Sequence, residues 1–163
     1  MESFLFDWGV GVAPRLSMVS HARVASADEQ VDALFRLDWD SRATVLVERE
    51  PAAAGETGPA LPPSARFVAD GANRVVAEAE VGASGGYLVL LDSYSEDWRA
   101  MVDGRPAAIV LANGLFRAVR LAPGRHVIEF VYRPATFLLG AGLSTLAFAG
   151  LLVLLAWRRA GRA

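Results

Sequence analysis

Apolar and polar side chains alternate along the second half of the chain. Residues 73–81 place alternate apolar side chains on one face and charged ones on the other. Residues 125–132 repeat the pattern, with His126, Ile128, Phe130 and Tyr132 on one face. A period of two residues is typical of a half-buried β-strand. The continuous apolar run 87–91 predicts a central strand.

Turn signals divide these strands at short intervals. Asp103-Gly104, Asn113-Gly114 and Pro123-Gly124 are typical of tight turns. About eight short strands with such spacing indicate a mainly β protein, an antiparallel, jelly-roll-like β-sandwich. We expect one domain over 14–134, with a short N-terminal helix starting at Ser26 or Asp28, and an exposed, mobile loop at 51–64.

An uncharged apolar stretch occupies 137–157 near the C-terminus. About 20 apolar residues span a hydrocarbon core of roughly 30 Å, so the stretch predicts a transmembrane helix over 135–158. Arg133 precedes it, and Arg158 and Arg159 follow it as membrane-flanking residues. The alternative is a buried core helix, which is rarely this long without a polar face.

The flanking arginines also predict an orientation in a bacterial cell membrane. The positive-inside rule assigns 159–163 to a cytoplasmic tail and the sandwich domain to the outside. Residues 1–13 form an irregular segment without the features of a signal peptide, so earlier membrane spans would have to deliver the domain. Small residues four apart, such as Gly140 and Ser144, would let neighbouring transmembrane helices pack closely. A tail-anchored protein with a cytoplasmic domain is the alternative topology.

The composition excludes some kinds of site and argues against some partners. The formal net charge is −2 and all 16 basic residues are arginine, which does not suggest a nucleic-acid partner. The chain has no cysteine, which excludes disulfides and thiolate sites. Asp38-Trp39-Asp40 has the form of a divalent-cation motif, but it is short and is better interpreted as a solvated linker. We expect no metal, no cofactor and no catalytic constellation.

A longer set of motifs carries a family resemblance. It comprises a Tyr94-x-x-x-Trp98 element that leads into Asp103-Gly104, then Asn113 with Phe116-Arg117, then Pro123, His126 and Phe130-x-Tyr132-x-Pro134 before the apolar helix. This pattern resembles the C-terminal region of the bacterial YfhO-type membrane proteins. The Pro14-Arg15 pair that leads into the first predicted strand resembles the same family.

The resemblance implies a function for the whole family rather than for this chain. The YfhO-type proteins resemble polytopic glycosyltransferases that use lipid-linked sugar donors, with the catalytic carboxylate in an early extracytoplasmic loop. This chain would then be a non-catalytic module that supports sugar transfer to cell-envelope glycans. The alternative is a membrane-tethered interaction or scaffold protein without a role in glycosylation.

The richest polar cluster is the segment 92–98, where carboxylates and hydroxyls accompany two aromatic rings. Asp92, Tyr94 and Trp98 are candidate glycan contacts, because an aromatic plane stacks on a sugar while a carboxylate binds its hydroxyls. The same oxygens could hold Ca²⁺. Trp98 shares a face with Ala100 and Val102, which favours a core anchor for that ring.

Overall fold

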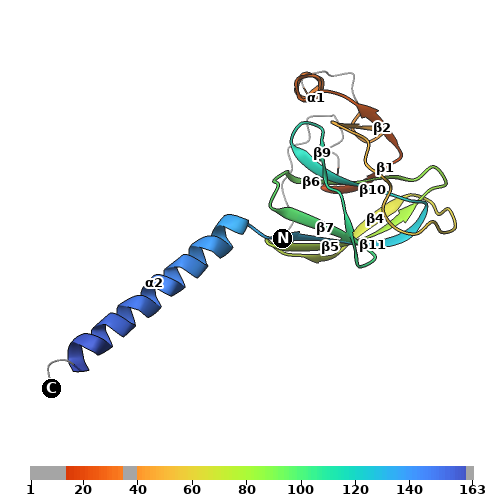
Figure 1. Ribbon diagram of the computed structural model, residues 1–163. Coiled ribbons are helices and arrows are strands. Elements are labelled where there is room, and N and C mark those ends of the chain that lie inside the picture. Colours follow the sequence, from red (N-terminus) through yellow and green to blue (C-terminus); the bar gives the residue numbers. More distant parts are fainter. Residues whose placement is uncertain (1–13, 35–39, 161–163) are drawn as a thin grey trace, which may run out of the picture. The chain divides into compact units, whose positions relative to one another are not determined.

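The computed structural model describes residues 14–34 and 40–160 (Figure 1). The predicted segment 1–13, Asp38 and Trp39 of the cation motif, and 161–163 of the predicted tail lie outside this range. The elements in chain order are β1 (Leu16–Val19), β2 (His21–Val24), α1 (Ala27–Leu34), β3 (Thr44–Val47), β4 (Ser64–Asp70), β5 (Arg74–Val81), β6 (Gly86–Ser93), β7 (Trp98–Val102), β8 (Arg105–Ala107), β9 (Val110–Ala112), β10 (Phe116–Leu121), β11 (Gly124–Tyr132) and α2 (Ala135–Ala160).

Two sheets pack face to face, as the alternating pattern predicts (Figure 1). One sheet has the strand order β1-β6-β10-β9-β3-β2 and the other β4-β5-β11-β7-β8. Side chains from both sheets form the core between them, among them Leu88, Leu90, Val119, Ile128 and Phe130. The structure is therefore mainly β with a two-sheet core, which is the β part of the predicted fold.

The six-stranded sheet curls back on itself, which the sequence pattern did not predict. Only Ser20 separates β1, at one end of its strand order, from β2, at the other. β2 pairs with β3 in parallel, so the sheet is not purely antiparallel. The curl encloses a second apolar cluster that includes Val45, Tyr87 and Val89. This explains why the 87–91 run is apolar on both faces: one face meets the other sheet and the other meets this second cluster.

Helix α1 begins with a reciprocal cap. The Ser26 backbone N–H donates to Glu29 Oε2 (2.8 Å), and the Glu29 N–H donates to Ser26 Oγ (3.4 Å). The Ser26 hydroxyl also donates to Glu29 Oε2 (2.9 Å), and the two bonds that the carboxylate accepts from Ser26 lower the pKa of Glu29. The buried Gln30 accepts the Gly114 N–H (2.8 Å) and donates to the Ala25 carbonyl (3.0 Å). One side chain thus connects the helix to the β9–β10 turn.

The predicted transmembrane helix over 135–158 needs correction. The element there is α2, within a compact unit, Arg133–Ala163, separate from Met1–Tyr132. Over the residues that the structure describes, no helix is both long enough and apolar enough to cross a membrane. The prediction is therefore wrong for the described part of the chain, and the membrane-flanking role of Arg133, Arg158 and Arg159 depended on it.

The segment 51–63, which we call the strap, has no regular structure but is fastened to the sheets. The Ala54 N–H donates to the Arg120 carbonyl (2.9 Å), and Ala54 in turn accepts the Ala122 N–H (2.9 Å). The Gly58 N–H donates to the Pro123 carbonyl (2.7 Å) and the Leu61 N–H to the Val81 carbonyl (3.1 Å). The predicted mobile loop is therefore held at four backbone hydrogen bonds.

Candidate functional site

Asp92 and Arg117 meet because β6 bulges where it pairs with β10. Phe116 pairs with Ser93, but Arg117 pairs with Leu90, so two extra residues of β6 lie between these pairs. A bulge redirects side chains out of the regular alternation. Asp92 lies in this bulge, and its Oδ2 accepts a hydrogen bond from Arg117 Nη2 (2.8 Å).

A second arginine shares the same carboxylate. Arg15, just before β1, donates to Asp92 Oδ1 from Nε (2.8 Å) and to Oδ2 from Nη2 (2.9 Å). Its Nη1 donates to Asp70 at the end of β4 (2.6 Å). These bonds, led by the one from Arg15, lower the pKa of Asp92, and the pKa of Arg15 is raised. One chain of alternating charges, Asp70–Arg15–Asp92–Arg117, therefore joins the two sheets.

Aromatic rings surround the buried end of this chain. The Arg117 side chain is 2% exposed, and its guanidinium carbon lies 3.7 Å from the centre of the Trp98 ring and 5.6 Å from that of Phe130. Such stacking partly replaces the lost hydration of the cation. Burial still dominates and lowers the pKa of Arg117, and its Nε is buried without a hydrogen-bond partner. We call these four charged residues, with Trp98 and Phe130, the Arg117 network.

The structure brings the three candidate glycan contacts to one end of the sandwich, but in different environments. Both oxygens of Asp92 are engaged by arginines. One face of Trp98 is covered by Arg117, and Tyr132 lies beside the ring at 5.2 Å between ring centres. Tyr94 is 36% exposed and follows the bulge, with its N–H donating to the Leu115 carbonyl (2.8 Å). Tyr94 is thus the more accessible of the two aromatic candidates.

The chemistry of the Arg117 network is that of a charge-balanced clamp. Two carboxylates face two guanidiniums, so no free acid or base is available for proton transfer. In the described ranges, no group of three or more His, Asp or Glu side chains could hold a metal ion. Asp40, the described member of the predicted cation motif, accepts the Arg42 N–H through Oδ1 (2.9 Å).

Stability in acid should report on this clamp. Because the folded pKa of Asp92 lies below its unfolded value, its contribution is complete above about pH 4 and is lost as the pH falls through the folded value. We expect Asp92→Asn to lower the free energy of unfolding at neutral pH by about 2 kcal/mol, less than for a fully buried pair because Asp92 is 24% exposed. The free energies of unfolding of wild type and Asp92→Asn, measured with denaturant from neutral to acid pH, should become more similar as the pH falls. A difference that stays constant contradicts this role.

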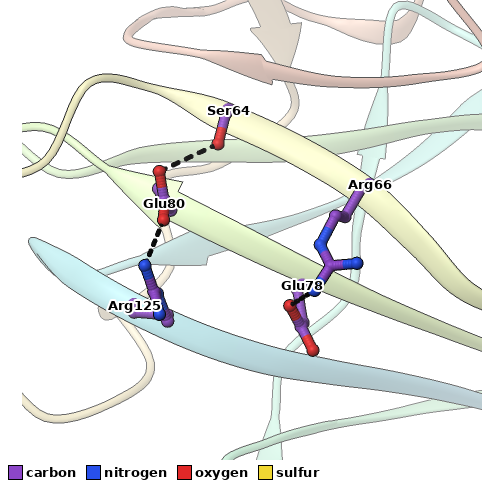
Figure 2. Close-up of a pocket in the computed structure, with 5 residues that line it drawn as sticks. All are labelled: Ser64, Arg66, Glu78, Glu80 and Arg125. Carbon is purple, nitrogen blue, oxygen red and sulfur yellow. Dashed lines mark hydrogen bonds and ion pairs between the residues drawn. The ribbon is translucent and has the colours of Figure 1, made fainter.

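The outer face of the five-stranded sheet carries a different charged surface (Figure 2). A cavity of about 180 Å³ is lined by Ser64, Arg66, Glu78, Glu80 and Arg125. Arg66 pairs with Glu78 across β4 and β5, and Arg125 pairs with Glu80 across β5 and β11. The arginines are 72% and 67% exposed, so these pairs contribute little to stability. They keep the face polar, and charges of opposite sign lie opposite one another.

Arg15 and Arg117 are the site residues whose role sequence reasoning missed, although both lie in the motifs that carry the family resemblance. A signal was present for Arg117. Arg117, Val119 and Leu121 are alternate residues of β10, so a period of two places Arg117 on the core-facing side of the strand. Arg15 had no such signal, because its partners are 55 and 77 residues away.

Comparison with known proteins assigns the region that holds most of the site. Residues 66–144 match the family model described as bacterial membrane protein YfhO. This stretch is therefore a YfhO-type membrane protein region, which confirms the resemblance seen in its motifs. It starts in β4 and includes Asp92, Tyr94, Trp98 and Arg117. Searches of curated proteins and of solved structures find no match for the chain.

Proposed function

We propose that this chain is a non-catalytic module of a YfhO-like membrane protein and supports the transfer of sugars from lipid-linked donors to cell-envelope glycans. In this proposal the sandwich lies outside the cytoplasm, next to other parts of the same or a neighbouring membrane protein. Protease added to intact cells should then cleave the domain, and protection until lysis would contradict the proposed side.

The observation that carries the proposal is an exposed aromatic ring beside a rigid polar clamp. Tyr94 follows Asp92 by two residues, and Asp92 is held by three hydrogen bonds from two arginines. We call the edge of the sandwich that carries Asp92, Tyr94 and Leu115 the rim. A sugar ring stacked on Tyr94 would contact this rim, whose backbone is already ordered, and this reduces the entropy lost on binding. Trp98 supports the same rim through Arg117, and the edge of its ring is the further contact proposed here.

Glycan binding by the whole chain in detergent or lipid nanodiscs tests this site. We expect Tyr94→Ala to weaken binding to an array of envelope glycans by about tenfold or more, the loss of one stacking contact plus its hydrogen bond. The matched control is Leu115→Ala at the same rim, which should bind as wild type does because leucine offers no stacking plane. Circular dichroism must show both variants folded, and undiminished binding by Tyr94→Ala contradicts the named site.

A scaffold role is the second candidate, favoured by apolar side chains at the same rim. Leu115 is 51% exposed and Val31 of α1 is 45% exposed. Val31 lies next to the β9–β10 turn, with its Cγ2 3.6 Å from the position that a Cβ on Gly114 would take. If Leu115→Ala abolishes pull-down of a protein partner while no glycan binds, the rim is a protein interface and the glycan proposal fails.

A further inference from the structure

His126 lies at the opposite end of β11 from the Arg117 network and is buried, with 1% of its surface exposed. Both ring nitrogens face acceptors. Nδ1 lies 2.7 Å from Asp103 Oδ2, and Nε2 lies 3.0 Å from the Ala122 carbonyl oxygen. The other oxygen of Asp103 accepts the Val127 N–H (2.9 Å), which holds the carboxylate in place. The site therefore offers the imidazole two acceptors and no donor.

This arrangement distinguishes the two charge states of the ring. A neutral imidazole has one N–H, so one of its nitrogens would direct a lone pair at an oxygen. An imidazolium donates from both nitrogens and makes a charge-assisted bond to Asp103. Protonated His126 satisfies the whole site, whereas the neutral ring leaves one buried acceptor without its donor, which is destabilising.

The strap closes directly over this ring. A Cβ on Gly55 would lie 2.3 Å from His126 Cε1, and Gly55 has a φ of +88°. On either side of Gly55, Ala54 bonds to the backbone of Arg120 and Ala122, and Glu56 pairs with Arg105 (2.9 Å). Ala122 also supplies the carbonyl that accepts from His126, so the ring and the strap share one anchoring residue.

Charged side chains from several elements surround His126. The strap contributes Glu56, and the β7–β8 turn contributes Asp103 and Arg105. β11 contributes Arg125, which pairs with Glu80 of β5. Gly55, Glu56, Val102, Asp103, Arg105 and Arg125 line a cavity of about 370 Å³. Two ion pairs, Glu56–Arg105 and Glu80–Arg125, already neutralise their own charges. Asp103 is therefore the carboxylate that pairs with the imidazolium of His126.

We propose that the strap is a proton-controlled closure, with His126 as its switch. While His126 carries a proton on both ring nitrogens, Asp103 and the Ala122 carbonyl are satisfied and the strap stays closed. Loss of one proton breaks one of these bonds and releases the strap, which uncovers the His126–Asp103 pair beside the 370 Å³ cavity that Gly55 and Asp103 line. The closed form is thus favoured at lower pH and lost as the pH rises.

Hydrogen exchange of the whole chain tests this. The probes are the amides of Ala54, Gly58 and Leu61, with protection corrected for the intrinsic exchange rate at each pH. We expect their protection to fall about tenfold between about pH 5 and about pH 8, the range in which histidine charge changes and the factor for losing one charged hydrogen bond. The Gly71 amide, bonded to the Arg74 carbonyl in the β4–β5 turn, should be unchanged.

The two histidines of the chain provide matched variants. His126→Gln should remove the pH dependence of the strap, while His21→Gln, at an exposed position, should retain it. If His126→Gln does not fold, ¹⁵N spectra of the wild-type imidazole serve instead, and ring titration and strap exchange must share one midpoint. Equal protection at both pH values, separate midpoints, or a pH dependence that survives in His126→Gln would each overturn the proposal.

Discussion

Replacing Arg117 with alanine is expected to lower the free energy of unfolding by about 3 kcal/mol. The guanidinium lies over Trp98, contacts Phe130 and donates to Asp92, and the side chain is fully enclosed. Alanine would leave a large cavity and remove one partner of Asp92. Arg15 still neutralises Asp92, so the loss comes mainly from packing. Denaturant unfolding followed by tryptophan fluorescence measures the difference.

Two further variants separate packing from charge. Arg117→Met fills a similar volume without a charge, and we expect a loss below about 1 kcal/mol because a buried ion pair and an apolar substitute are often close in energy. Arg66→Ala removes an exposed pair with Glu78 and should change stability by less than about 0.5 kcal/mol. If Arg117→Met is as unstable as Arg117→Ala, the charge of Arg117 and not its packing holds this end of the sandwich.

Gly55→Ala is the second substitution with a large expected effect. The new methyl group would lie 2.3 Å from His126 Cε1, closer than carbon atoms approach, and alanine is also strained at a φ of +88°. His126 is enclosed between Asp103 and Ala122 and cannot move aside. We expect a loss of about 3 kcal/mol from strain and overpacking together, or displacement of the strap. Thermal unfolding and exchange of the Ala54 amide distinguish these outcomes.

Gly104→Ala is the matched control for the backbone effect. Gly104 has a φ of +77° but nothing within 4 Å of the position that a Cβ would take. It should therefore show only the strain of the left-handed conformation, about 1 kcal/mol. If the two glycine variants lose equal stability, the close contact between the strap and His126 does not contribute, and the closed strap is not tightly packed on the ring.

The family region and the strands of the second half were predictable from local pattern. β5 and β11 follow the period-two alternation of their residues, and the turns at Gly104, Gly114 and Gly124 have positive φ. Such features depend on neighbours in the chain, so a sequence alone determines them. The motifs of 66–144 likewise identified a YfhO-type region.

The apolar stretch near the C-terminus is a case in which local pattern misled. Its length and lack of charge predicted a transmembrane helix, and α2 forms there. No helix in the described part of the chain meets the length and apolarity that crossing a membrane requires.

The site itself was decided by tertiary structure. Sequence supplied Asp92, Tyr94 and Trp98 as a local cluster, and period two placed Arg117 and His126 on faces that point into the core. Which partners they meet depended on the bulge in β6, on the curl of the six-stranded sheet and on the path of the strap. A buried cation requires an acceptor, but the acceptor can come from anywhere in the chain. For Arg117 the acceptor is Asp92, 25 residues before it in the chain, and the buried His126 meets Asp103 in a turn 23 residues before it. The sequence by itself thus determined which residues needed partners, and only the packing of the two sheets decided which partners they have.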